Sequence, residues 1–114
     1  MSRYMLLLYA DEKAGLALPK EAMAGWMDKM AAYGDALQKA GALISNGALG
    51  ITAAATTVHV ENGEMQVHNG PYAETREQLG GYYLIEAENL AAAQKWAAQC
   101  PAALWGTIEI RQIQ

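Results

Sequence analysis

The sequence predicts one α+β domain, residues 1–114, with a ferredoxin-like fold in which two βαβ units flank an inserted β-hairpin. Two observations support this prediction. Apolar spacing alternates along the chain in the order strand, helix, strand, hairpin, strand, helix, strand. The length of 114 residues, with 53% apolar and 18% charged residues, suits a single globular domain.

The first βαβ unit covers the first 45 residues. Residues 4–9 form a short apolar run, which is typical of a central strand covered on both faces. Pro19 suits the first position of a helix, and Gly41 suits its end. Residues 42–45 follow as the second strand.

The predicted helix carries an apolar stripe rich in methionine. A stripe of this kind can line a ligand pocket, but more often it forms core, and we favour core. Its members recur at helical spacing: Met23, Trp26, Met27, Met30, Tyr33, Gly34 and Leu37.

A β-hairpin is predicted around Asn62-Gly63, which tolerates the two positive φ angles of a type I′ turn. In the resulting register Val60 faces Met65 and Val58 faces Val67. These four apolar side chains share one face, which we expect to pack inward. Polar side chains, including both histidines, share the other face, which we expect to look outward.

The second βαβ unit begins with a strand at residues 80–86. Asn89 suits the N-cap of the next helix, and Pro101 ends that helix. Residues 107–111 alternate as the last strand. Along the helix, one side is formed by Leu90, Ala93, Trp96, Ala97 and Cys100.

Two helices on one face of a sheet leave the other face open. An apolar open face must be hidden, and a second sheet packed against it would do so. We therefore expect a homodimer.

Composition argues against several kinds of partner and site. A net charge of -4 disfavours binding to nucleic acid or to an anionic membrane. The single cysteine, Cys100, excludes an internal disulfide and suits a small buried thiol. The apolar run at residues 4–10 is too short for a signal peptide or a membrane span, so we expect a cytoplasmic protein.

No cofactor or metal site is predicted. The glycine pair Gly80-Gly81 precedes a strand, whereas a phosphate-binding loop places glycines after a strand and before a helix. His59 and His68 lie as diagonal neighbours on the hairpin, with no third ligand nearby in sequence. A solvent-facing surface is the favoured interpretation of the two histidines.

Residues 69–78 form the candidate functional site. The turn Asn69-Gly70-Pro71 could aim the polar side chains that follow it. Tyr72, Arg76 and Gln78 could bind a small polar or anionic ligand together with Asn69, and Glu74 could act as an acid–base catalyst if it were desolvated. An ordinary turn whose polar groups satisfy one another is an equally good interpretation of these residues.

The sequence also resembles the YCII-related family, in its DGPF subgroup. The resemblance rests on the apolar run at residues 4–9 with its acidic end, on residues 55–58, on the segment 73–85, and on residues 97–101 and 108–111. It implies a ferredoxin-like subunit that pairs into a dimeric α+β barrel. It also implies an association with extracytoplasmic-function sigma factors, which suggests a regulatory partner.

Two departures from the family pattern weaken a catalytic role. The name-giving Asp-Gly-Pro-Phe of the subgroup is Asn69-Gly70-Pro71-Tyr72 here, so the first carboxylate is lost. A His–Asp pair suggested for the family has no matching positions. We therefore expect a small-molecule-binding homodimer, with a cofactor-independent enzyme using Glu74 and a sigma-factor-binding module as alternatives.

Overall fold

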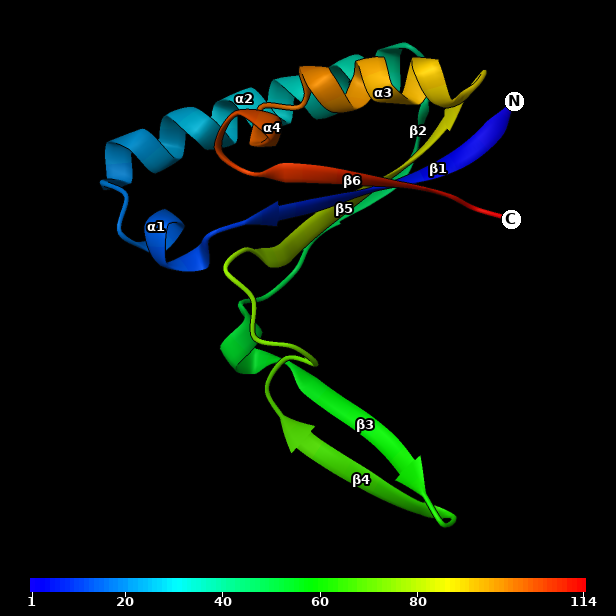
Figure 1. Ribbon diagram of the computed structural model, residues 1–114. Coiled ribbons are helices and arrows are strands. Elements are labelled where there is room, and N and C mark those ends of the chain that lie inside the picture. The colour runs from blue at the N-terminus through cyan, green and yellow to red at the C-terminus, as the bar shows by residue number, and fades with distance from the viewer.

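The computed structural model describes residues 1–114 as a four-stranded antiparallel sheet with helices on one face, and a separate hairpin that stands away from it (Figure 1). The sheet contains β1 (Ser2–Ala10), β2 (Leu43–Ala48), β5 (Gln78–Ala87) and β6 (Thr107–Gln112). The helices are α1 (Glu12–Leu16), α2 (Lys20–Lys39), the 3₁₀ turn η1 (Thr52–Ala54), α3 (Leu90–Gln99) and α4 (Ala102–Trp105). The hairpin contains β3 (Thr56–Glu61) and β4 (Glu64–Asn69).

The strand order confirms the predicted α+β class. The strand order is β2-β5-β1-β6, so β1 and β5 are the central pair. Strand β5 of the second βαβ unit lies between β1 and β2 of the first, and β1 lies between β5 and β6. This arrangement is compatible with a ferredoxin-like fold. The helices α1, α4 and η1 were not predicted.

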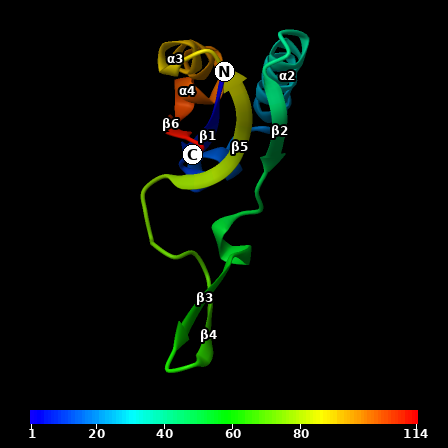
Figure 2. The ribbon, with the colours of Figure 1, turned by 90° about the vertical axis from the view of Figure 1, so that its right-hand side faces the viewer.

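The core lies between the sheet and the helices α2 and α3, which cover the same face (Figure 2). Leu6 of β1 and Ile85 of β5 are fully buried there. From α2 only Tyr33 and Leu37 are buried. The prediction that the whole methionine-rich stripe forms core is therefore wrong for the first half of α2, where Met27 is 64% exposed.

Helix ends are close to the predicted positions. The side chain of Asn89 accepts a hydrogen bond from Ala92 N at 2.9 Å, as an N-cap does. Gly41 has a φ of 71°, a conformation that favours glycine just after a helix. Pro19 immediately precedes the first residue of α2. Leu90 is 51% exposed, so it does not join the buried side of α3.

The glycine pair shapes the start of β5. The pairing of β1 with β5 passes from Leu8↔Gly81 to Tyr9↔Leu79, which leaves Gly80 as the extra residue of a β-bulge. A Cβ atom added to Gly81 would lie 3.0 Å from the carbonyl oxygen of Gly47. The predicted role of the pair, a close approach of backbones at a strand start, is confirmed.

The hairpin has the predicted register and turn. Val58 pairs with Val67 and Val60 with Met65, and both turn residues have positive φ angles, 53° at Asn62 and 78° at the glycine after it. The expectation that the apolar face packs inward is wrong for the single chain. All four apolar side chains are between 55% and 68% exposed. The four-stranded sheet and its helices, which we call the body, do not reach the hairpin (Figure 1).

The sheet face away from the helices has no cover in the single chain. Met5, Leu7 and Leu84 point to this face and are half-buried. The predicted central position of β1 is confirmed, whereas only one of its faces is covered by this chain. None of the helices has the length and apolar character that crossing a membrane would require.

Candidate functional site

The predicted site, residues 69–78, is the connection from the hairpin back to the sheet. Asn69 is exposed and ends β4. Gly70 is buried, and its N–H donates a hydrogen bond to Ala55 O at 2.7 Å. The hydroxyl of Thr57 donates to Gly70 O, also at 2.7 Å. The turn is therefore fastened to the start of β3.

The polar side chains after the turn do not gather. Tyr72 is 92% exposed. Glu74 and Arg76 are exposed, and neither makes an ion pair or a side-chain hydrogen bond. Only Gln78 is half-buried and bonded, so the single chain does not bring the five predicted residues into one cluster.

Gln78 has a structural partner in the first helix. Its amide oxygen accepts a hydrogen bond from Glu12 N at 2.9 Å, and its amide nitrogen donates to Thr75 O. The carboxylate of Glu12 in turn accepts from Thr52 N and from the Thr52 hydroxyl, both at 2.8 Å. These bonds hold α1, η1 and the connection together.

Sequence analysis missed the roles of Glu12 and Thr52. Glu12 belongs to the acidic end of the first apolar run, and 40 residues separate it from Thr52. A partner so distant leaves no spacing pattern in one sequence. The acidic residue after the strand was the one available signal.

A pocket of about 660 Å³ lies beside this network, between residues 49–55 and the connection. Tyr72 and Gln78 line it, whereas Asn69, Glu74 and Arg76 do not. Its other polar side chains include Tyr9 and two threonines, and no charged residue contributes to the lining. The structure thus places a pocket next to the predicted segment, with a neutral surface.

The phenol of Tyr9 is the most perturbed polar group of this pocket. Partial burial raises its pKa, and the neighbouring Glu109 carboxylate raises it further. Tyr9 therefore stays protonated at neutral pH and can donate a hydrogen bond.

Glu74 lacks the surroundings that an acid–base catalyst needs. Such a carboxylate is usually desolvated beside a second titratable group, and Glu74 is exposed without a polar partner. In the single chain, no feature of the structure activates it.

The remaining candidate groups are separate from this pocket. His59 and His68 are exposed on the hairpin, and no three His, Cys, Asp or Glu side chains gather as a possible metal site. Cys100 is buried, as predicted, and burial raises the pKa of its thiol. A thiol in this state is unreactive.

Comparison with known proteins identifies the family. The family model of the YCII-related domain matches residues 2–114, which is nearly the whole chain. The chain belongs to the YCII-related family. The match includes the hairpin and the connection as well as the sheet.

A curated relative supports this assignment. The YCII-related chain is similar to an uncharacterized protein of Rhizobium meliloti (strain 1021), with 36% identity over 112 residues. The matched region covers 96% of this chain and 90% of the relative. The two proteins therefore share the domain over almost their full lengths.

Proposed function

We propose that this YCII-related chain is a homodimer that binds a small, neutral, partly polar molecule between residues 49–55 and 71–79. The pocket of about 660 Å³ at this place is the observation that carries the proposal. A concave site with a mainly apolar lining and a few hydrogen-bonding groups is typical of small-molecule binding.

The lining favours a neutral ligand over an anion. No lysine or arginine lines the pocket, so an anion would find no opposite charge there. The phenols of Tyr9 and Tyr72 can donate hydrogen bonds to a carbonyl or hydroxyl oxygen. The amide of Gln78 already makes hydrogen bonds within the chain, so it lines the pocket without binding the ligand through them.

The surface of the single chain supports a dimer. A compact monomer of 12.3 kDa exposes about 6,100 Å², whereas this chain exposes 8071 Å². Its radius of gyration of 16.0 Å also exceeds the roughly 13 Å expected for this length. The excess surface, about 2,000 Å², is as large as one protomer contributes to an obligate interface.

The uncovered sheet face and the hairpin are the surfaces we assign to this dimer, arranged as an α+β barrel. The face carries Met5, Leu7 and Leu84, and the hairpin adds its four apolar side chains. Tyr9 and Leu79, paired across the sheet, line the pocket as well. The proposed ligand site therefore lies at the edge of the proposed interface.

Sedimentation velocity at micromolar protein tests the dimer. We expect the mass of two chains, and dissociation in Leu7→Lys, which would place a charge on the uncovered face. Ala24→Lys on the exposed side of α2 is the matched control and should leave the mass unchanged. A monomeric parent protein would refute the dimer.

Native mass spectrometry of protein purified without dialysis tests the ligand site. We expect a retained small molecule, and a lower occupancy in Tyr72→Ala, whose exposed side chain contributes little to folding. Leu104→Ala, also exposed and outside the pocket, is the control. Equal occupancy in both variants would contradict this location.

The two alternative functions, an enzyme and a sigma-factor-binding module, have less support from the structure. The enzyme hypothesis relies on Glu74, which is exposed and without a partner. A sigma-factor partner stays a prediction of the family resemblance. Pull-down with the full chain, followed by identification of captured proteins, would test it.

A further inference from the structure

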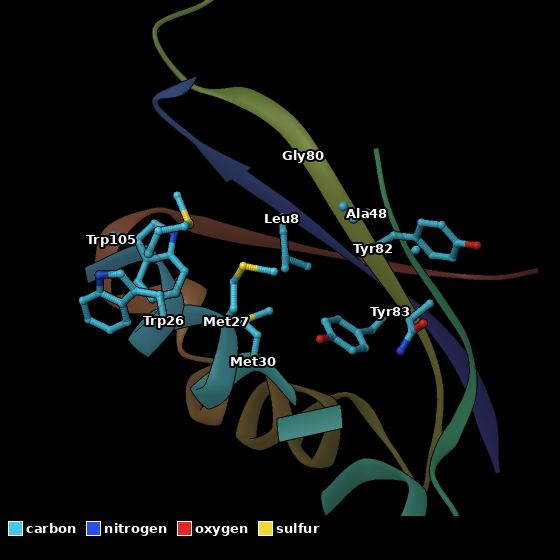
Figure 3. Close-up of a pocket in the computed structure, with 13 residues that line it drawn as sticks. Leu8, Trp26, Met27, Met30, Ala48, Gly80, Tyr82, Tyr83 and Trp105 are labelled. Carbon is cyan, nitrogen blue, oxygen red and sulfur yellow. The ribbon is translucent and has the colours of Figure 1, made fainter. Parts of the chain in front are cut away.

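A second hollow lies on the opposite side of the sheet, under the first half of α2 (Figure 3). It encloses about 390 Å³ and shares no residue with the pocket described above. Asn46 and Tyr83 supply its polar side chains, and no charged residue lines it.

At this hollow, large side chains of α2 lie opposite small residues of the sheet, and the space between them is not filled. Met23, Met27 and Met30 of α2 line the hollow, and none of them is buried. The sheet beneath supplies Ala48 and Gly81, which have at most a methyl group to fill the space. Methionine is flexible and polarizable, so these side chains can adapt to an apolar guest.

Two tryptophans form one wall of this hollow. The rings of Trp26 and Trp105 lie 4.4 Å apart between centroids, at 59° to each other, and Lys29 Nζ lies 4.6 Å from the Trp26 ring. Both indoles line the hollow beside Met27 (Figure 3). Aromatic rings and sulfur atoms offer favourable contacts to a flat aromatic molecule.

Tyr83 supplies a polar group that has no partner in the protein. The residue is only 8% exposed, yet its hydroxyl makes no hydrogen bond within the chain. Its ring points from β5 toward Met30, whereas Tyr82 points the other way (Figure 3). By contrast, the neighbouring Tyr33 hydroxyl donates to Trp96 O at 2.7 Å.

No buried side-chain oxygen or nitrogen of the chain lacks a hydrogen-bond partner, so the Tyr83 hydroxyl is open to solvent in the hollow, where a bound molecule can accept its hydrogen bond. Burial raises the pKa of Tyr83, which keeps the phenol protonated and able to donate. The hydroxyl thus presents a hydrogen-bond donor next to the Asn46 amide, in a hollow whose other side chains are mainly apolar.

We propose that this hollow is a second binding site, for a flat, neutral, mainly aromatic molecule that carries a carbonyl oxygen. The rings would contact the methionines and the tryptophan pair, and the carbonyl would accept the hydrogen bond of Tyr83. The site is independent of the ligand and of the dimer proposed above.

Acetylnaphthalene and ethylnaphthalene are suitable probes, because they match in shape and only the first carries a carbonyl oxygen. In NMR titrations of the full chain, we expect the indole N–H signals of Trp26 and Trp105 to shift with both probes. The signal of Trp96, which does not line the hollow, is the internal control. Absence of these shifts up to the solubility limit of both probes would overturn the proposal.

Tyr83→Phe separates the hydrogen bond from the apolar contacts. It should weaken acetylnaphthalene binding about three- to tenfold, the usual worth of one hydrogen bond, and leave ethylnaphthalene binding unchanged. Tyr72→Phe, in the first pocket, is the matched control and should change neither affinity. Equal affinity of Tyr83→Phe and parent protein for acetylnaphthalene would refute the assigned donor.

Trp105→Ala tests the place of binding and does not depend on the hydroxyl. This variant should weaken both probes, with the circular dichroism spectrum unchanged, because Trp105 is 39% exposed and lies in the short α4. Unchanged affinity for both probes in folded Trp105→Ala would place binding elsewhere, for example on the uncovered sheet face, and would overturn the proposal.

Discussion

The helix-covered sheet and the hairpin use apolar side chains in opposite ways. In the sheet, Leu6 and Ile85 are fully buried against helices. In the hairpin, Val58 and Val67 form an ideal cross-strand pair, yet each is more than half exposed. Correct pairing therefore does not by itself produce a core.

The difference shows where the single chain is incomplete. An isolated two-stranded hairpin is marginally stable at best in water. Four exposed apolar side chains on one of its faces gain little from folding until something covers them. A second copy of the chain, as proposed above, would supply that cover.

Loss of a core side chain should have the largest effect on stability, far above that of a hairpin side chain. Leu37→Ala removes a fully buried side chain, so we expect the free energy of unfolding to fall by about 3 kcal/mol. Val60→Ala, which is 61% exposed in the single chain, should cost less than about 0.5 kcal/mol at protein concentrations so low that the chain is monomeric. Chemical denaturation measures both, and a larger loss for Val60→Ala that grows with protein concentration would show the hairpin covered by a second copy.

Alkaline pH should act on the body and not on the hairpin, which contains no tyrosine or cysteine. Burial raises the pKa of Tyr33, Tyr83 and Cys100 in the folded state. These neutral groups contribute fully to folding stability at pH values below their pKa values in the unfolded chain. That contribution is lost as the pH rises through their higher pKa values in the folded chain. We expect the unfolding free energy to fall above about pH 9, by up to roughly 1.4 kcal/mol per pH unit for each group.

Tyr83→Phe provides the control for this pH dependence. Removing one titrating phenol should make the fall above pH 10 shallower, since one fewer proton is released on unfolding. A slope identical to that of the parent protein would contradict the buried, neutral state of Tyr83.

Local signals explain why much of the fold could be predicted from the sequence. The hairpin register follows from Asn62-Gly63, and the start of α3 follows from Asn89, because each residue acts on its immediate neighbours. The α+β class follows from the two strand–helix–strand patterns, whose strands do share one sheet.

Long-range contacts explain what could not be predicted. The methionine-rich stripe has one periodicity, but only its second half reaches the sheet, because small residues lie under the first half. Glu12 bonds to Thr52 across 40 residues, and no local pattern indicates such a pair. Of the five candidate site residues, only Tyr72 and Gln78 line a pocket, since the connection turns the others to solvent.

Two glycine substitutions should have opposite effects on stability, one in the hairpin and one in the body. Gly63→Ala forces alanine into a φ of 78° and should destabilise the hairpin by about 1 kcal/mol. Gly25→Ala lies inside α2 with open space around the added methyl group, and should stabilise the body by about 0.5–1 kcal/mol. Hydrogen exchange of β3 and β4 reports the first effect, and thermal unfolding the second. A Gly63→Ala protein with unchanged exchange would argue that the turn does not limit hairpin stability.

The smallest effects should come from the two carboxylates beside the connection that carries the hairpin. Glu12→Gln weakens the bonds to Thr52 that tie α1 to η1, and should cost about 1 kcal/mol. Glu74→Gln removes an exposed charge without a partner and should change the unfolding free energy by less than about 0.5 kcal/mol. Equal losses would mean that the Glu12 bonds do not anchor the connection. A large loss for Glu74→Gln in the assembled protein would mean that the second copy buries this carboxylate, and would restore the conditions under which it could act as an acid–base group.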